Sequence, residues 1–192
     1  MLKVAITGNI ASGKSTVEKF LRGKNYKVLD ADFVAHNLLE KENVKTQIKD
    51  AFKDYDILND GTISRQKLAK IVFEDEFLRK KLECILHPLI KEEIIYFFSS
   101  NSAEKIIFVS VALLFEAGFD NVFDKTILIY AKDKIRLKRL IARNNLSEEQ
   151  AKNRIKIQMK QDEKVPLVDY VIYNDGEISD LPEKIEQILK LL

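Results

Sequence analysis

The chain of 192 residues carries 32 Lys and Arg against 30 Asp and Glu, which leaves a formal net charge of +2 at pH 7. This balance excludes the broad positive field of a nucleic-acid-binding surface, so we expect no nucleic-acid partner. The length predicts one compact α/β unit with a substantial core, and the single cysteine excludes a disulfide framework within the chain.

The apolar segments give no sign of targeting or membrane insertion. Met1 leads directly into an apolar, strand-like segment, which predicts that no signal peptide is present. The longest apolar runs, 106–115 and 122–130, are too short or too interrupted to span a bilayer. We therefore expect a soluble, cytoplasmic protein without a membrane partner.

A glycine-rich loop near the N-terminus carries the motif G-x-x-x-x-G-K-S. The apolar, β-branched segment 2–7 before it predicts a buried strand, and apolar residues at helical spacing in 15–21 predict a helix after it. Strand, glycine loop and helix form the context of a phosphate-binding loop (P-loop), whereas an ordinary glycine turn is the disfavoured alternative. The predicted nucleotide-binding residues are Gly8, Asn9, Ile10, Ala11, Ser12, Gly13, Lys14, Ser15 and Thr16.

Two residues of this loop have more specific expected roles. Lys14 is expected to reach the β- and γ-phosphates of a nucleotide, and the Ser15 hydroxyl is expected to ligate Mg²⁺. The sequence therefore predicts a nucleotide site with a magnesium cofactor.

A pair of carboxylates follows the second predicted strand, 26–29. Asp30 and Asp32 lie where this strand ends and a helix begins, and in an open parallel sheet the same edge holds the P-loop. The pair predicts a base for a substrate hydroxyl or a magnesium contact, whereas capping of the helix is the simpler alternative. His36, one turn further along, is expected to be a solvated helix residue.

Residues 41–100 are expected to be mainly helical and to contain no parallel strand. Within them, 56–64 resembles the start of a calcium-binding EF-hand loop, but the register places Leu58 and Lys67 where two oxygen ligands belong. We predict instead a turn that leads into a helix capped by Ser64.

Three further residues of this helical segment, His87, Pro88 and Cys84, carry separate expectations. Pro88 disfavours helical geometry at His87, which predicts a helix boundary or kink there. His87 itself fits a structural role as well as a functional one. Cys84 lies in an apolar helical pattern and is expected to be a small buried hydrophobic residue.

The second half of the chain alternates strands and helices. Asp133 is expected to cap one helix, and Ser147 with Gln150 fits a capping box at the start of the next. Apolar patterns predict strands at 105–111, 124–130 and 169–173, and a final amphipathic helix at 181–192.

The two helices after the strand at 124–130 are rich in basic residues. Arg139 and Arg143 fall one turn apart on one side of the first, and Gln158 is expected within the second. This arrangement favours a mobile lid that brings arginines onto a transferring phosphate, and a solvated helix face is the alternative.

In this order the motifs resemble those of one family, the dephospho-coenzyme A kinases, and the similarity extends over the whole chain. The P-loop alone is shared by many families. More specific for this family is the succession of the acidic pair, His-Pro and Leu-Leu-Phe-Glu in this order. The matching pieces are the P-loop, Asp30-Ala31-Asp32, Asp60-Gly61 with Arg65, His87-Pro88, Leu113-Leu114-Phe115-Glu116, Arg143 with Leu146-Ser147-Glu148-Glu149, Gln158, and Asp169-Tyr170-Val171-Ile172 with Asn174 and Gly176.

The resemblance implies an α/β fold of the P-loop NTPase class, with a five-stranded parallel sheet like that of nucleoside monophosphate kinases. A helical substrate-binding insertion and a lid interrupt the core. The expected single domain, 1–192, divides into a core at 1–40, 101–135 and 165–192, an insertion at about 41–100 and a lid at about 136–164.

The resemblance also implies an activity and a set of site residues. ATP with Mg²⁺ would phosphorylate the ribose 3′-hydroxyl of dephospho-coenzyme A, the small-molecule partner, to give coenzyme A and ADP. A monomer or weak oligomer is expected. Asp32 matches the proposed base, Lys14, Arg139 and Arg143 the other catalytic residues, and Asn174 and Gly176 further nucleotide-binding positions. The substrate-binding positions would be Asp32, Arg65, His87, Leu114 and Glu116.

The chain departs from the family pattern at several positions. Asn9 and Ala11 replace glycines of the loop, and Asn144 replaces the aspartate that usually follows Arg143. Ser110 and Ala112 stand where the family often has Asp-x-Pro, which leaves Asp30 or Glu116 to supply the carboxylate behind the magnesium.

Other functional classes fit the sequence less well. Another small P-loop kinase of the nucleoside monophosphate or metabolite type is the main alternative. A GTP-driven switch is disfavoured because the chain has no N-K-x-D tetrapeptide, and no D-x-x-G follows the third predicted strand. A silent nucleotide-binding or calcium-binding module would leave Lys14, Ser15 and Asp32 without a purpose.

Overall fold

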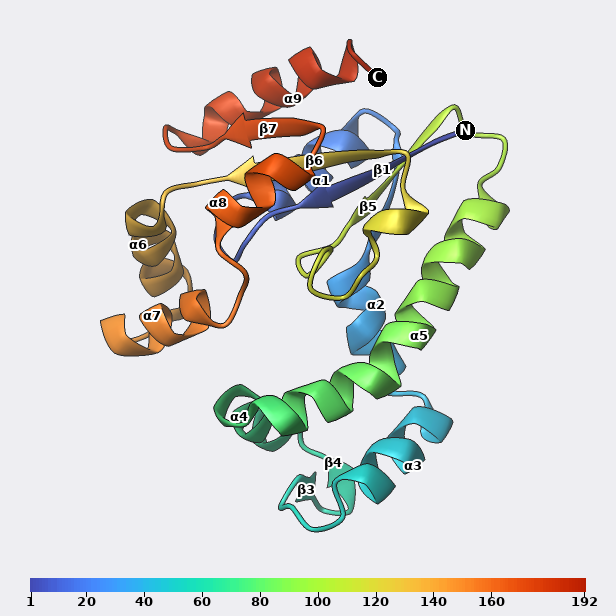
Figure 1. The fold of residues 1–192 in the computed structure, drawn as a ribbon, viewed down its shortest axis with the longest axis vertical. Coiled ribbons are helices and arrows are strands. Elements are labelled where there is room, and N and C mark those ends of the chain that lie inside the picture. Colours follow the sequence, from blue (N-terminus) through green and yellow to red (C-terminus); the bar gives the residue numbers. More distant parts are fainter. The chain divides into compact units, whose positions relative to one another are not determined.

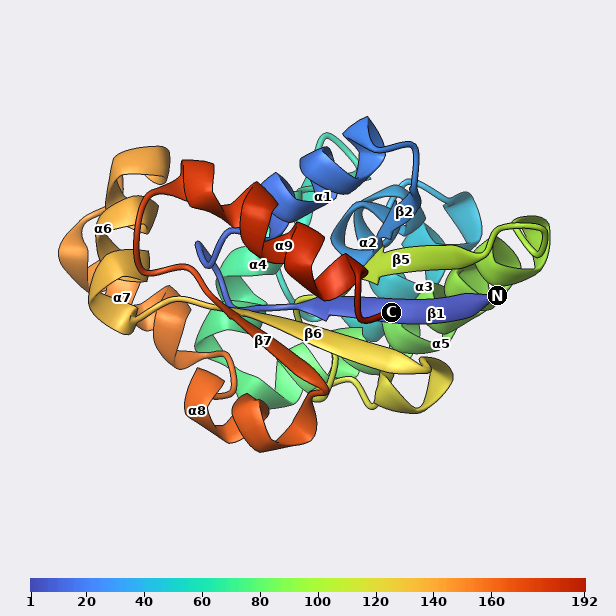
Figure 2. The ribbon, with the colours of Figure 1, turned by 90° about the horizontal axis from the view of Figure 1, so that it is seen from above.

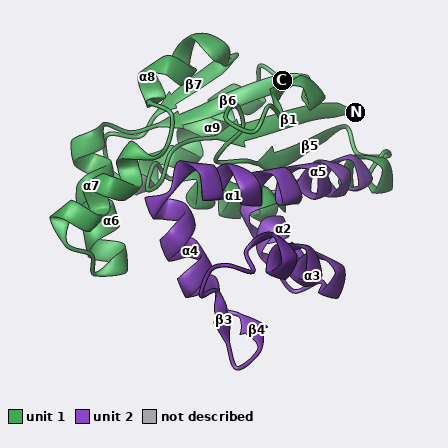
Figure 3. Ribbon diagram, turned by 60° about the horizontal axis from the view of Figure 1, so that its bottom comes forward, with its two compact units in different colours: residues 1–31, 97–192 green, residues 32–96 purple. Residues whose placement is uncertain are grey.

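The computed structural model describes the backbone of residues 1–192 and every side chain except that of Ile178. The chain folds into two compact units (Figure 3). Unit 1 comprises Met1–Ala31 and Phe97–Leu192, and unit 2 comprises Asp32–Tyr96. Unit 2 thus starts nine residues before the expected insertion at about 41–100, because the helix that follows the second strand belongs to it.

Unit 1 is built on a five-stranded sheet in which every neighbouring pair is parallel, as the resemblance implied. The strand order is β2-β5-β1-β6-β7, so β1 lies at the centre and the loop that follows it starts in the middle of the sheet. Because the strands are parallel, all their carboxyl ends meet at one edge. The strands are β1 (Leu2–Thr7), β2 (Lys27–Asp30), β5 (Ile106–Ser110), β6 (Lys125–Tyr130) and β7 (Tyr170–Tyr173).

Helices cover both faces of this sheet. α1 (Lys14–Gly23) and α9 (Leu181–Leu189) pack side by side on one face, and α8 (Gln161–Lys164) lies on the other (Figures 1 and 2). Alternate strand residues point toward α1 and α9, as the period of two requires. The resulting buried cluster consists of Val4, Ile6, Val17, Leu21, Phe108, Ile127, Ile129, Ile172, Leu181 and Ile185.

Two further helices follow β6. At the start of α7 the predicted capping box is confirmed, since Ser147 Oγ accepts from Gln150 N at 3.2 Å and Gln150 Oε1 accepts from Ser147 N at 3.0 Å. The expected cap by Asp133 is wrong: Lys132 is the N-cap and Asp133 is the first helical residue, where its carboxylate binds Arg136 at 2.7 Å. The remaining elements of unit 1 are α6 (Asp133–Asn144), α7 (Glu148–Lys156), η1 (Asp120–Val122), η2 (Val165–Leu167) and η3 (Ile178–Asp180).

Unit 2 is helical apart from a hairpin of two very short strands. Positive φ angles at Asp60 (47°) and Gly61 (76°) form the tight turn that an Asp-Gly pair favours. Lys67 Nζ donates to Asp56 Oδ1 at 2.9 Å and to the Leu58 carbonyl at 2.6 Å, so an ammonium group binds the oxygens of the EF-hand-like segment. The elements are α2 (Ala31–Leu38), α3 (Glu42–Ala51), β3 (Leu58–Asn59), β4 (Thr62–Ile63), α4 (Arg65–Glu74) and α5 (Glu76–Ser100), whose last turn lies in unit 1.

The prediction for Ser64 is confirmed, and two others in this unit are corrected. Ser64 Oγ caps α4 by accepting from Lys67 N at 3.4 Å. Of the two outcomes predicted at His87-Pro88, the helix boundary is wrong, because α5 runs through Pro88 as one helix of 25 residues, and the kink stays a prediction. Cys84 is exposed rather than buried, since it shares the outer face of α5 with Pro88, one turn further on. Across the described residues, no helix has the length and apolar character to cross a bilayer.

Candidate active site

The P-loop connects β1 to α1, and both of its glycines are required by their surroundings. Gly8 (φ 156°) and Gly13 (φ 114°) have backbone angles that side chains disfavour. A Cβ at Gly8 would lie 2.6 Å from the Ile129 carbonyl, and one at Gly13 would collide with the side-chain amide of Asn174. Gly13 is also the N-cap of α1 and has no side chain to cap it, so this helix end presents backbone N–H groups to an anion.

The two departures from a glycine-richer loop have different consequences. Ala11 has φ 62°, a left-handed conformation that costs a non-glycine residue roughly 1–2 kcal/mol. Asn9 is buried, with 1% of its surface exposed, and its Nδ2 donates to the Met159 carbonyl at 2.8 Å. Asn9 therefore anchors the loop through a side chain that glycine lacks.

Several buried polar atoms around the loop have no hydrogen-bond partner among the described residues. Ser12 Oγ and Asn9 Oδ1 lie in the loop, and Arg136 Nε and Arg139 Nη1 lie on α6. An unsatisfied buried polar group costs roughly 1–3 kcal/mol, so such atoms mark a place where a polar ligand or water is expected. Their position around the P-loop fits the binding of a phosphorylated ligand.

The structure brings the predicted positions of β7, α6 and the loop together. Asn174 Nδ2 donates to the Ser12 carbonyl at 2.7 Å, and Arg139 Nη2 donates to the Gly176 carbonyl at 3.0 Å. Arg143, by contrast, is exposed, and its Nε donates to the adjacent Asn144 Oδ1 at 2.9 Å. Arg143 thus makes a hydrogen bond with a neutral amide at Asn144 rather than an ion pair.

The segment after α7 binds the loop directly, which the sequence did not predict. Gln158 was expected within a helix, but α7 ends at Lys156 and leaves Gln158 at a bend in the connection to α8. Gln158 Oε1 accepts from Ile10 N at 2.7 Å, and Met159 N donates to Glu116 Oε1 at 3.2 Å. The segment therefore ties the P-loop to the connection that follows β5.

Two buried cations were also missed, because charged residues in a charged stretch suggest a solvated surface. Arg136 is 2% exposed and its Nη1 donates to the Ile10 carbonyl at 3.4 Å. Lys164 is fully buried, and its Nζ lies 2.9 Å from Glu116 Oε1 and 3.3 Å from the Ala112 carbonyl. Burial lowers the pKa of Lys164; the Glu116 carboxylate opposes this effect, and the positive charges of Lys14 and Arg136 add to it.

We expect the substitution Glu116→Gln to destabilise the protein by about 3 kcal/mol, because it leaves the Lys164 ammonium buried without a counter-charge. It also lowers the pKa of Lys164 further. At pH values between the lowered pKa of folded Lys164 and the usual 10.5, the unfolded chain binds more protons than the folded chain. The free energy of unfolding therefore rises with pH, and the difference in stability between the variant and the native protein becomes smaller. Urea unfolding at neutral pH and at about pH 9.5 measures both effects.

The exposed acid Glu163 provides the matched control for this prediction. Glu163→Gln should change stability by less than about 0.5 kcal/mol. In a Lys164→Met background, Glu116→Gln should lower the free energy of unfolding much less than in the native protein, because no buried ammonium group then loses its counter-charge. Equal costs in the two backgrounds would contradict an energetic link between Glu116 and Lys164.

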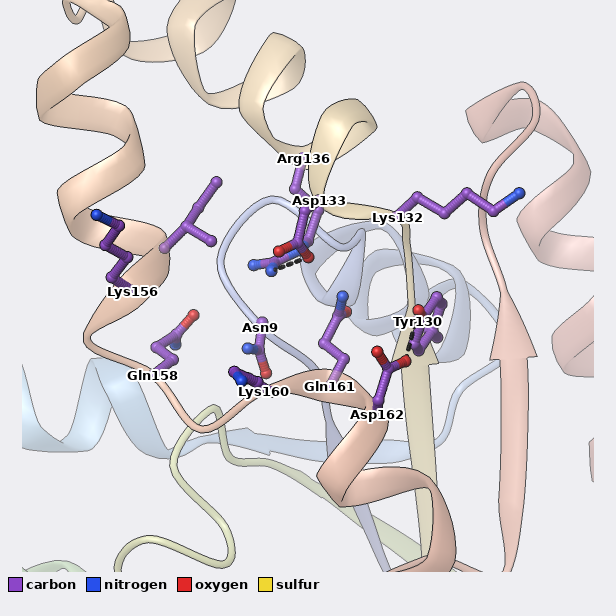
Figure 4. Close-up of a pocket in the computed structure, with 11 residues that line it drawn as sticks. Asn9, Tyr130, Lys132, Asp133, Arg136, Lys156, Gln158, Lys160, Gln161 and Asp162 are labelled. Carbon is purple, nitrogen blue, oxygen red and sulfur yellow. Dashed lines mark hydrogen bonds and ion pairs between the residues drawn. The ribbon is translucent and has the colours of Figure 1, made fainter.

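A cavity of about 290 Å³ opens beside the loop in unit 1 (Figure 4). The cavity is lined by Asn9, Arg136 and Gln158. Asn9 belongs to the P-loop and the other two contact it, so the cavity is part of the same site. At its far side Tyr130 donates to Asp162 Oδ1 at 2.8 Å, and this hydrogen bond raises the pKa of Tyr130 to about 12. The other lining residues are Lys132, Asp133, Ile155, Lys156, Lys160, Gln161 and Asp162.

Three of the predicted site residues belong to unit 2. Asp32 is exposed in the first turn of α2. Arg65 Nη1 lies 3.1 Å from His36 Nδ1 and pairs with Glu40, and the hydrogen bond from Arg65 lowers the pKa of Glu40. His36 is exposed as predicted, but it contacts Arg65.

His87 and Leu114 complete the predicted substrate positions. His87 is half-buried on α5, and burial lowers its pKa against a smaller opposing effect of the Glu83 carboxylate. Leu114, in unit 1, is fully buried, so a substrate-binding role there stays a prediction from the resemblance.

A central strand leading into a P-loop, with arginines and a buried lysine around it, defines a P-loop phosphotransferase fold of the nucleoside-monophosphate-kinase type. The sequence profile of the dephospho-CoA kinase family matches residues 2–180. The chain belongs to the dephospho-CoA kinase family.

Known relatives agree over nearly the full length of the chain. The dephospho-CoA kinase of Oceanobacillus iheyensis is 38% identical over 98% of this chain and 96% of its own. A crystal structure from Thermus thermophilus superposes with a TM-score of 0.86 at 34% identity, covering 100% of this chain and 97% of that one. The Campylobacter jejuni dephospho-CoA kinase gives a TM-score of 0.72 at 29% identity over 98% and 95% of the two chains. A shikimate kinase from Acinetobacter baumannii shares the fold alone, at 15% identity and a TM-score of 0.57 over 99% and 93%.

Proposed function

We propose that the chain transfers the γ-phosphoryl group of ATP to the ribose 3′-hydroxyl of dephospho-CoA, giving CoA and ADP. The observation that carries this proposal is the family match over residues 2–180, together with an intact P-loop at the centre of the sheet. A GTP switch or a silent binding module has no comparable support. The reaction is placed in the cytoplasm, with the chain acting as a monomer or weak oligomer, and both remain predictions.

The P-loop residues 8–16 form the proposed phosphate site. Its backbone N–H groups and Lys14 hold the donor phosphates, and Lys14 balances charge that develops on the transferring group. Asn174 keeps the loop in shape through the Ser12 carbonyl, and Arg139 with Gly176 borders the proposed nucleotide site. The unpartnered Ser12 Oγ and Arg139 Nη1 are polar atoms that a nucleotide would satisfy.

Magnesium fits the oxygen-rich end of the loop. Ser15 is exposed at the start of α1, and the hydroxyl of Ser110 lies at the carboxyl end of β5. The Ser15 hydroxyl, together with phosphate oxygens and water, would give the oxygen ligands that Mg²⁺ prefers. The ion would neutralise phosphate charge when bound. Ser15 is the proposed direct ligand.

Asp32 is the proposed base for the 3′-hydroxyl, and the lid arginines supply positive charge. Asp32 follows the carboxyl end of β2 by two residues, and it is exposed in the first turn of α2. Arg139 and Arg143 lie within the proposed lid, about 136–164, where Arg143 is exposed and able to change partner. Arg65, His87, Leu114 and Glu116 are the further proposed substrate-binding positions.

A coupled ADP-release assay tests this function. The protein is given ATP and Mg²⁺ with dephospho-CoA, and in parallel with adenosine, AMP and other nucleoside monophosphates. We expect ADP release with dephospho-CoA alone and CoA as the product. Turnover on a nucleoside monophosphate instead would favour the alternative of another small P-loop kinase and overturn the proposed substrate.

A further inference from the structure

A buried carboxylate on α1 contacts the carboxyl end of β5 beside the P-loop, and none of the functions proposed above uses it. Glu18 is 5% exposed, and its Oε1 accepts a hydrogen bond from Ser110 Oγ at 2.6 Å. Ser110 is fully buried and is the last residue of β5, and its Cα pairs with that of Ile6, two residues before Gly8. The pair therefore lies where the central strand passes into the loop.

The burial of this carboxylate is not explained by an ion pair. Arg22 approaches Glu18 Oε2 only to 3.5 Å, and the Arg22 side chain is 47% exposed. A solvated pair of this kind contributes about 0–1 kcal/mol, whereas burying a carboxylate costs several kcal/mol. An apolar residue at position 18 would pack against the sheet with a smaller free-energy cost of burial. Packing alone therefore does not explain a carboxylate at this position.

The direction of the Ser110 hydrogen bond is fixed by its partner. A carboxylate only accepts, so the Ser110 hydroxyl donates its one hydrogen to Glu18. The lone pairs of Ser110 Oγ are then left to accept a hydrogen bond from elsewhere. A water molecule bound to a cation is a strong donor of this kind.

The position of the pair matches the magnesium ligand proposed above. Glu18 follows Ser15 by three residues on α1, so the two side chains share a face of the helix. Asp30 is the Cα partner of Ser110 on β2, and partners in adjacent strands point to the same face of the sheet. Ser15, Glu18, Ser110 and Asp30 thus bring oxygen atoms to one corner of unit 1.

We propose that Glu18 is a positioning residue for the magnesium ion: through Ser110 it orients and strengthens an acceptor for the ion's bound water. In this arrangement the carboxylate that acts on the ion through Ser110 belongs to α1 and does not lie at the end of β5. The proposal rests on the Mg·ATP site of the proposed function. It differs from the expectation that Asp30 or Glu116 alone supplies this carboxylate.

The test compares binding of a fluorescent ATP analogue in Mg²⁺ and in EDTA, which needs no turnover. In Glu18→Gln we expect the Mg²⁺ concentration for half-maximal enhancement to rise about 10–100-fold, as is usual when an outer partner of a metal is lost. Affinity in EDTA should stay within about twofold of the native value, because Glu18 is not proposed to contact the nucleotide. Glu186→Gln, which alters an exposed acid on α9 in the same unit, is the control that should leave both values unchanged.

Two further variants make the result independent of folding defects. Ser110→Ala removes the acceptor and should reproduce the effect of Glu18→Gln. The double variant Glu18→Ala with Ser110→Asp moves the carboxylate to the strand end and should restore the native Mg²⁺ dependence, which a merely structural role for Glu18 would not allow.

The outcomes separate this proposal from the proposed function. An unchanged Mg²⁺ dependence in Glu18→Gln and Ser110→Ala would overturn the role of Glu18 while leaving ATP binding intact. An equal loss of affinity in EDTA and in Mg²⁺ would show that Glu18 only supports the fold. If the native protein failed to bind the analogue in either condition, the proposed function itself would fail.

Discussion

Replacing Asp32 by asparagine should lower kcat about 10²–10⁴-fold and leave the affinity for ATP near its native value. Asparagine keeps the size of the side chain and can still accept a hydrogen bond from the substrate hydroxyl, but it cannot take up the proton. Because Asp32 lies outside the P-loop, in the first turn of α2, the donor phosphates should bind as before. The measurement is the ADP-release rate with dephospho-CoA, beside ATP affinity from titration.

The matched control for this variant is Asp54→Asn, which alters another exposed acid of unit 2. It should leave kcat unchanged. An acid in the first turn favours a helix by roughly 0.3–1 kcal/mol, so Asp32→Asn should lower the melting temperature only slightly. A loss of turnover with little loss of stability would therefore come from the missing base and not from unfolding of the protein. If turnover stayed within a few-fold of native, the assignment of Asp32 as the base would be wrong.

The local patterns of the sequence predicted the parts of the fold that depend on neighbours in the chain. The strand before the P-loop was placed at Leu2–Thr7, where the structure has it, because it is mostly apolar and contains the β-branched residues Val4, Ile6 and Thr7. The caps at Ser64 and Ser147 were predicted correctly because each depends on a hydrogen bond to a residue three positions away. The Pro88 boundary failed because packing of the long helix outweighs the one backbone hydrogen bond that proline removes.

The contacts around the site depend on residues far apart in the chain, which explains why they were missed. Glu18 and Ser110 are 92 residues apart, and Gln158 binds the loop across 148. Lys164 and Arg136 are charged, and a charged residue is usually solvated, so burial of either contradicts the ordinary expectation. Only the fold shows that their partners converge on the loop.

The shape of the loop gives the second large effect: Gly13→Ala should destabilise the protein by about 3–5 kcal/mol and greatly weaken ATP binding. At φ 114° a side chain is strained, and the added Cβ would collide with the Asn174 amide and lie 3.2 Å from Leu181 Cδ2. Asn174 is 1% exposed and holds the Ser12 carbonyl, so moving it breaks a buried hydrogen bond. Thermal unfolding and ATP titration measure the two effects.

Gly118→Ala separates the two causes, because Gly118 also has a positive φ, 65°, but a Cβ there meets nothing within 4 Å. It should cost only the backbone strain, about 1 kcal/mol, and leave ATP binding unchanged. The difference between the two variants then measures the contacts with Asn174 and Leu181, together with the greater backbone strain at φ 114°. Adding Asn174→Ala to Gly13→Ala should recover part of the stability, because the smaller side chain makes room for the new methyl group. If Gly13→Ala cost no more than Gly118→Ala, Asn174 would not be what holds the loop in its phosphate-binding shape.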